Sequence, residues 1–177
     1  MSSGLLVLQL FLCSFSTSIS NAPTGIPSGF PANIVVQAGL RAVVAQLWEG
    51  SPTFRAQCQK IGEQKRYRVA VVLEPSLTLS RNCRAQCVLR VYSSGFVTAR
   101  VMVPHGRQVT ELIPHELEHI VEHIEGVNVK SEVSRGGTGA FDAGGGRVET
   151  VRAMRVGRQA RQELDASRGA VALLTRR

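Results

Sequence analysis

The chain has 177 residues, of which 44% are hydrophobic and 19% are charged, and its formal net charge is +8. These values are typical of one globular domain that buries a core without help from disulfides or metals. The positive charge comes from 18 arginines and 3 lysines and permits an anionic partner. However, the sequence has no RNP-like aromatic motif, no zinc-finger spacing and no long basic block, so we predict no nucleic-acid partner.

The first twenty residues carry no charged side chain, and Leu5 to Phe15 form an apolar run as long as the core of a signal peptide. This run is too short to span a bilayer. Small residues around Ser20 offer cleavage sites, although the basic segment that usually precedes such a run is missing. We predict a signal peptide over residues 1–20 and a linker over residues 21–32. The protein would then be secreted or periplasmic, with no stable membrane span after cleavage; an uncleaved anchor is the alternative.

Hydrophobic periodicity predicts an α+β domain over residues 33–167 and a basic tail over residues 168–177. Apolar residues at helical spacing predict a first helix over residues 34–48. A Ser-Pro pair, typical of an N-cap and a first-turn proline, opens a second helix over residues 51–61. The N-terminal part of the domain is therefore expected to be helical.

A small three-stranded sheet follows, with strands over residues 66–74, 84–92 and 95–104. The connection between the last two strands is short, which predicts an antiparallel hairpin. Cys83 and Cys87 lie on one face of the middle strand, about 13 Å apart at the usual rise, which is too far for a mutual disulfide. Cys58 is free to pair with either of them, and buried free thiols are the alternative.

The second half of the chain alternates between helix and glycine-rich sequence. A helix is predicted over residues 111–125 and ends at Gly126. Residues 131–147 contain many glycines but lack the ending of a phosphate-binding loop, so a linker or a mobile lid is expected there. A last helix is predicted over residues 148–164.

The segment His115-Glu116-Leu117-Glu118-His119 fits the pattern H-E-x-x-H. On a helix, the two histidines lie about 40° apart around the axis and about 6 Å apart along it, so both imidazoles can bind one cation. Glu116 can then reach a water on that cation. We predict Zn²⁺ bound by His115 and His119, with Glu116 as the catalytic base. A surface helix that is merely rich in Glu and His is the alternative.

Zinc needs a third protein ligand if one position is to stay open for catalysis. His123 and Glu122 lie too far along the helix from His115 to share its ion comfortably. Glu149 falls in the small apolar stripe of the last helix and is the predicted third ligand, because a buried carboxylate needs a partner or a metal. Asp142 is the rival ligand, and an exposed helix-start glutamate is the other interpretation of Glu149. The stripe consists of Glu149, Ala153, Val156, Ala160 and Leu164. The arginines on the opposite side of the predicted helix are Arg147, Arg155, Arg158 and Arg161.

The order of helix, strands, "HELEH" helix and "ETVRA" helix over residues 34–164 resembles the zincin metallopeptidases, and specifically their gluzincin branch. In that family the two histidines and the later glutamate bind zinc, and the glutamate of the motif is the base. The resemblance implies these roles for His115, His119, Glu149 and Glu116, and hydrolysis of a peptide or protein substrate. It also implies that an edge strand, here residues 95–104, holds the substrate backbone. An Asp that the family often has four residues after the ligand Glu is replaced by Ala153, and the gap from His119 to Glu149 is long.

Two other functions stay open at this point. One is a non-catalytic metal-binding or interaction module with a zincin-like fold. The other is a cationic protein that binds surfaces through its arginine-rich last helix. For the enzyme, His105, His123 and Tyr92 are the candidates to stabilise the oxyanion. The substrate and the oligomeric state are not determined by these patterns.

Overall fold

The computed structural model describes residues 25–76, 85–106, 108–136, 139–144 and 147–174. The predicted signal peptide and Cys83 lie outside these residues. In chain order the elements are β1 (Ile34–Val36), the 3₁₀ turn η1 (Ala38–Leu40), α1 (Arg41–Gly50), α2 (Pro52–Gly62), β2 (Tyr67–Leu73), β3 (Gln86–Val91), β4 (Val97–Val103), α3 (Val109–Ile124), α4 (Val129–Arg135), β5 (Ala140–Gly144), β6 (Arg147–Thr150) and α5 (Val151–Leu174). The fold is α+β, as predicted.

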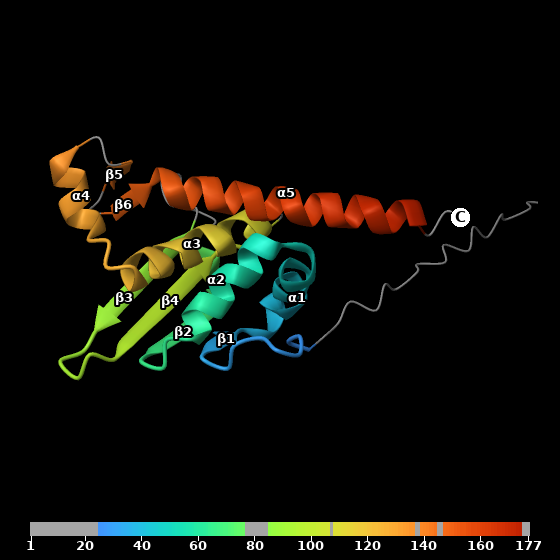
Figure 1. Cartoon of the computed structure of the whole chain (residues 1–177), viewed down its shortest axis with the longest axis horizontal. Coiled ribbons are helices and arrows are strands. Elements are labelled where there is room, and N and C mark those ends of the chain that lie inside the picture. Colours follow the sequence, from blue (N-terminus) through green and yellow to red (C-terminus); the bar gives the residue numbers. More distant parts are fainter. Residues whose placement is uncertain (1–24, 77–84, 107, 137–138, 145–146, 175–177) are drawn as a thin grey trace, which may run out of the picture.

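The main sheet has four strands in the order β1-β2-β4-β3. β1 and β4 run parallel to β2, and β3 runs antiparallel to β4, which confirms the predicted hairpin. The helices α1, α2 and α3 lie on one face of this sheet, and α5 runs across the helices on the side away from the strands (Figure 1). β4 is interior, so the prediction that residues 95–104 form an edge strand is wrong. β3 forms the edge instead.

The first predicted helix begins too early, because Ile34–Val36 pair with β2 as a parallel strand. All three residues are β-branched, which favours an extended chain. Ile34 and Val36 are buried while Val35 is 63% exposed, as the alternation of a strand requires. The sheet therefore has four strands rather than the predicted three, and the helix starts only at Arg41. The second helix is confirmed, with the Ser51 hydroxyl accepting a hydrogen bond from the Phe54 N–H at 3.0 Å.

The core lies between the inner face of the sheet and the helices. Alternate residues of β2 and β4 point into it, and the apolar face of α3 packs against them. Cys58 is a buried member of this core and Cys87 packs against it; both are free thiols, so they do not pair with each other. Burial raises the pKa of both thiols well above the usual range. Within the described part of the chain, no helix is both long enough and apolar enough to cross a bilayer.

The described residues of the glycine-rich segment, which was predicted as a flexible linker or lid, mostly form regular secondary structure. The segment contains the end of α4 and the antiparallel hairpin of β5 and β6. Its glycines supply backbone turns that other residues avoid, with φ of +66° at Gly136 and +83° at Gly144. The hairpin extends up to Thr150, so the last helix starts three residues later than expected, at Val151, and it continues to Leu174. Glu149 consequently lies on a strand and not on the helix.

Helix α5 packs closely on α3 through small residues. Ala153 and Ala160 are 0% exposed, and Gly157 lies between them on the same buried face. A Cβ atom at Gly157 would lie 2.7 Å from the Glu111 carbonyl oxygen and 3.0 Å from the His115 Cβ. The absence of a side chain at this position therefore lets the two helix backbones approach each other beside the first histidine of the motif.

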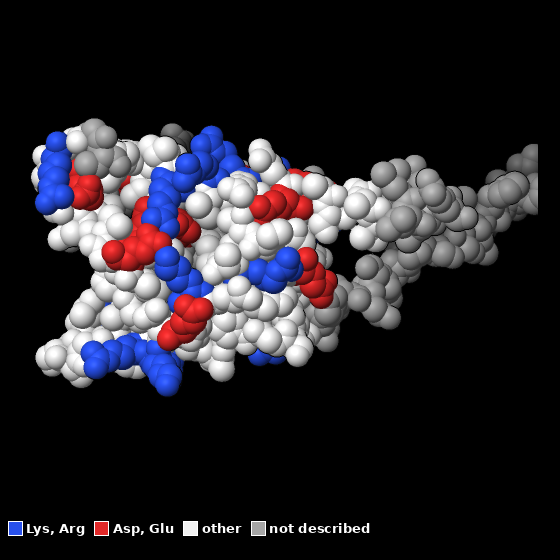
Figure 2. All heavy atoms as spheres, in the orientation of Figure 1, with Lys and Arg blue, Asp and Glu red and all other residues white. Residues whose placement is uncertain are grey.

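Charged side chains link the helices at the surface. Basic and acidic residues alternate over α2, α3 and α5 (Figure 2). Arg152 of α5 donates to Glu118 at 2.6 Å and to Glu125, and Lys60 of α2 also donates to Glu125. In the middle of α5, Glu163 accepts hydrogen bonds from Ser51 and Thr53 at the start of α2. These contacts fix the position of α5 across the other helices.

Candidate metal centre

Helix α3 presents its two sides to different environments. Ile113, Leu117 and Ile120 are 0% exposed and pack into the core, as the helical spacing predicts. The side chains of His115 and His119 lie on the opposite side, where they are 12% and 13% exposed. Their ring centroids are 5.3 Å apart, so the i,i+4 spacing places both imidazoles beside one point.

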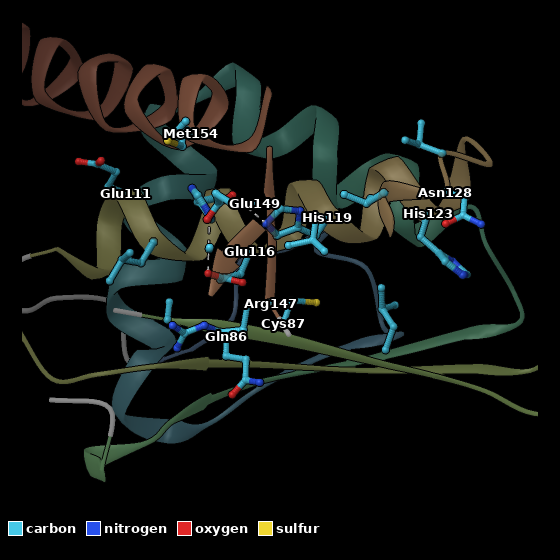
Figure 3. Close-up of a pocket in the computed structure, with 18 of the residues that line it drawn as sticks. Gln86, Cys87, Glu111, Glu116, His119, His123, Asn128, Arg147, Glu149 and Met154 are labelled. Carbon is cyan, nitrogen blue, oxygen red and sulfur yellow. Dashed lines mark hydrogen bonds and ion pairs between the residues drawn. The ribbon is translucent and has the colours of Figure 1, made fainter. Parts of the chain in front are cut away.

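Glu149 of β6 completes the group. Its Oε2 lies 3.0 Å from His115 Nε2, and its Oε1 lies 3.3 Å from His119 Nε2. One ligand atom from each of the three residues falls within 4.8 Å of the others (Figure 3). Ligand atoms around a tetrahedral zinc lie roughly 3.3 Å apart, given bonds of about 2.0–2.1 Å. Two imidazoles and one carboxylate converging in this way fit a zinc site that keeps one position open.

Asp142, the rival ligand, lies elsewhere. It is exposed on β5, and its Oδ1 accepts a hydrogen bond from the Gly144 N–H at 2.7 Å. It serves the turn of the hairpin, and it is not part of the group that could hold a metal. Glu149 does lie beside both histidines, but a strand and not the predicted helical stripe directs it there.

Glu116 lies next to the three candidate ligands. Its Oε1 is 3.9 Å from His115 Nε2, and the residue is 5% exposed. Burial raises the pKa of Glu116 to about 7, although His115, His119 and a hydrogen bond from the backbone of Cys87 act in the other direction. A buried carboxylate that is readily protonated beside a candidate metal site has the properties of a general base.

His119 has a second carboxylate partner that sequence reasoning missed. Its Nδ1 lies 3.0 Å from Glu122 Oε2, and the Thr150 hydroxyl donates to Glu122 Oε1 at 2.8 Å. Burial alone would lower the pKa of His119, but the hydrogen bonds to Glu122 and Glu149 raise it to about 10. The i,i+3 spacing of His119 and Glu122 was a signal in the sequence. No sequence pattern near Thr150 predicted its contact with Glu122.

A cavity of about 920 Å³ opens over the candidate ligands. It is lined by parts of α3, β3, the β5–β6 hairpin and α5, including Ala85, Cys87, Leu89, Leu112, Val127, Val148 and Met154. Arg147 and Arg158 also line it, and Arg147 is labelled among the lining residues in Figure 3. From the sequence, Arg147 was predicted to lie with the other arginines on the far side of the last helix. Its position on β6, two residues before Glu149, directs it to the cavity instead.

The three candidates for the oxyanion differ in position. His123 lines the cavity, but its Nδ1 is 2.8 Å from the Tyr67 hydroxyl, which holds the ring in place. Tyr92 lies at the β3–β4 turn against Phe96, with ring centroids 6.4 Å apart. Neither Tyr92 nor His105 is among the described residues that line the cavity. Arg147 and Arg158 are the arginines that line the cavity.

Comparisons with known proteins identified no relative of the chain. No protein-family model, no curated protein and no solved structure matches the chain. Within the site, residues from α3 and β6 that are 34 positions apart are brought within hydrogen-bond distance.

Proposed function

We propose that the chain is an exported zinc-dependent metallopeptidase with a gluzincin-like site. The observation that carries this proposal is the convergence of His115, His119 and Glu149 on one point, with the buried carboxylate of Glu116 beside it. Imidazole nitrogen and carboxylate oxygen are the donors that catalytic zinc uses, in sets of three. When bound there, zinc would polarise a carbonyl group and lower the pKa of a water molecule.

The residues of the chain have distinct roles in this reaction. His115, His119 and Glu149 hold the metal. Glu116 accepts a proton from the water that attacks the peptide carbonyl, and it passes this proton to the leaving amine as the C–N bond breaks. The products are a carboxylate and an amine. Arg147 donates hydrogen bonds to the carbonyl oxygen as negative charge develops on it, which its position in the cavity supports.

The substrate backbone would lie along β3. This strand is at the edge of the sheet, and its inner residues Cys87 and Leu89 line the cavity. The unpaired backbone groups of an edge strand can add an extended peptide by β-augmentation. The backbone of Cys87 also hydrogen-bonds Glu116, so a peptide on this edge would pass close to the proposed base. β3 thus takes the role that the family resemblance implied for residues 95–104.

The substitution Glu116→Gln tests the proposal. The amide fills the same space but cannot accept a proton from water, so turnover should fall at least about a hundredfold. About one zinc per chain should remain in elemental analysis of the purified protein. Glu118→Gln is the matched control, because Glu118 is also buried on α3 but bonds Arg152 and Gln57. Cleavage of a peptide library by wild type and control, but not by Glu116→Gln, is the expected result.

Other outcomes of this experiment separate the alternatives. Zinc bound without any cleavage by wild type would favour the non-catalytic metal-binding module. Undiminished activity of Glu116→Gln would show that Glu116 is not the base. If the purified protein takes up no transition metal even after incubation with zinc, the enzymatic proposal is wrong.

A further inference from the structure

We propose that Glu122 and Thr150 form a positioning pair that orients His119 and joins the α3 ligands to the strand carrying Glu149. This inference rests on the proposed zinc site and assigns residues outside the ligand set. Glu122 lies one turn after His119 on α3, and Thr150 directly follows Glu149 at the junction of β6 and α5. The pair therefore connects the two parts of the chain that supply the ligands.

Glu122 bonds the ring nitrogen of His119 that faces away from the other ligands. His119 Nε2 points to Glu149 at 3.3 Å, while its Nδ1 lies 3.0 Å from Glu122 Oε2. A histidine that binds a metal through Nε2 must carry its proton on Nδ1. The Glu122 carboxylate accepts a hydrogen bond from this Nδ1–H group, which fixes both the tautomer and the orientation of the His119 ring.

Thr150 holds the other oxygen of the same carboxylate. Its hydroxyl donates to Glu122 Oε1 at 2.8 Å and accepts from the Ala153 N–H at 3.0 Å, so it also caps the start of α5. Thr150 is 4% exposed and Glu122 is 2% exposed, so water competes little for these bonds. The residue next to Glu149 is thereby fixed to α3, 28 positions away in sequence.

This arrangement also accounts for Ala153. The resemblance led to an expected acidic residue at that position, but the residue there is Ala153, which is 0% exposed. Glu122 supplies a carboxylate from α3 instead, and Thr150 orients it. Burying this charge would be costly without hydrogen bonds, and the described partners of the Glu122 side chain are His119 and Thr150.

Glu118 shows that burial on α3 alone does not produce these contacts. It is 3% exposed, similar to Glu122, but it bonds the Arg152 guanidinium and the Gln57 amide between α2 and α5. Glu118 therefore contributes to helix packing, and Glu122 to the orientation of a ligand. The two residues form a matched pair for an experiment.

The test measures zinc affinity by competition with a chelating dye and records the visible spectrum of bound Co²⁺, which reports ligand geometry. Loss of such an outer partner typically weakens metal binding by about 10–100-fold. We expect Glu122→Ala to lose affinity in this range and to change the Co²⁺ spectrum. Glu122→Gln keeps the shape and one acceptor, so it should lose less. Glu118→Gln should keep wild-type affinity and spectrum.

Thr150 variants test the second half of the pair. Thr150→Ser retains the hydroxyl and should bind zinc like wild type, whereas Thr150→Val should weaken binding severalfold. Adding Thr150→Val to Glu122→Ala should cost little further affinity, because the two residues act through one hydrogen-bond chain. The midpoint of urea unfolding for each metal-free variant separates a loss of metal binding from a loss of fold.

Several results would overturn the inference. Wild-type zinc affinity and Co²⁺ spectrum in both Glu122→Ala and Glu122→Gln would show that His119 needs no such partner, while the zinc site itself would stand. An equal loss in Glu118→Gln would show a general effect of buried carboxylates. If wild type itself binds no metal, the proposed function fails first and this inference with it.

Discussion

The two sources of the candidate ligands, helix α3 and strand β6, differ in how the fold holds them. α3 is anchored by a fully buried face that includes Leu117, and its two histidine side chains are 12% and 13% exposed. β6 belongs to a two-stranded hairpin whose other strand is mostly exposed, and the Glu149 side chain is 24% exposed. The histidine pair is thus built by helical geometry, whereas Glu149 reaches it only because the hairpin and α5 dock on α3.

Because the two elements are held differently, changes in α3 and in the hairpin should affect different properties of the protein, namely its stability and its metal binding. The inner face of α3 contacts strands and helices throughout the core, so a change there acts on the whole domain. The hairpin contributes few core residues, so a change there acts mainly on the third ligand. Substitutions on the two sides should therefore give different combinations of stability loss and affinity loss.

The largest effect is expected from Glu149→Ala. Structural zinc sites with four ligands release about 10–16 kcal/mol, or roughly 2.5–4 kcal/mol per ligand, so affinity should fall by about two to three orders of magnitude. The metal-free protein should stay folded, because α3 keeps its core contacts. Zinc competition with a chelating dye and circular dichroism measure the two properties. Asp142→Ala is the control and should change affinity less than about twofold; if Asp142→Ala loses the metal and Glu149→Ala keeps it, the assignment of the third ligand is wrong.

A core substitution on α3 should show the opposite behaviour. Leu117→Ala should lower the free energy of unfolding by about 2–5 kcal/mol, because Leu117 is 0% exposed among core side chains. Phe141→Ala on β5 removes a side chain that is 40% exposed and should cost less than about 1 kcal/mol. Urea unfolding of the metal-free proteins compares them. Equal losses in the two variants would contradict the proposed division between core and hairpin.

The close approach of α5 to α3 can be tested at Gly157. The added methyl group of Gly157→Ala would meet the Glu111 carbonyl oxygen and the His115 Cβ, so we expect a loss of about 1–3 kcal/mol. Zinc affinity should also fall, because the helix that follows Glu149 is displaced beside His115. Gly169→Ala is the matched control in the same helix, where nothing lies within 4 Å, and it should stabilise by about 0.5–1 kcal/mol. Thermal unfolding of both variants measures the difference, and a neutral Gly157→Ala would argue against tight packing here.

The smallest effect concerns Glu163 in the middle of α5, away from the candidate metal centre. Burial opposes ionisation of Glu163, but hydrogen bonds from Ser51 and Thr53 outweigh it and lower its pKa. A carboxylate whose folded pKa is lowered stabilises the fold above its unfolded pKa, near 4.5, and this contribution is lost as the pH falls below that value. Glu163→Gln should therefore be less stable than wild type at pH 7 by under about 1 kcal/mol, with the gap closing toward pH 3. Urea midpoints at both pH values test this, and a gap that widens in acid would contradict it.

Local sequence patterns correctly predicted those helices and strands whose own residues show a clear cap or a clear apolar period. The Ser-Pro pair predicted the start of α2, and the alternation of apolar residues predicted β2, β3 and β4. Such signals failed at Ile34–Val36, where a strand of three residues is too short to show its period beside a helical one. They also failed in the glycine-rich segment, because a hairpin with exposed residues has no clear apolar alternation. The candidate ligands were predicted as a set, although the element that carries Glu149 was not.

The sequence by itself determined the histidine pair, since the i,i+4 spacing on an amphipathic helix places His115 and His119 together whatever surrounds them. Only the tertiary structure decided what completes the site. Glu149 meets His115 across 34 positions, and Thr150 meets Glu122 across 28. Both contacts depend on the docking of α5 through Gly157, and on the strand that turns Arg147 and Glu149 to the same side. Side-chain periodicity describes one element at a time, so it contains no information on which elements will be neighbours.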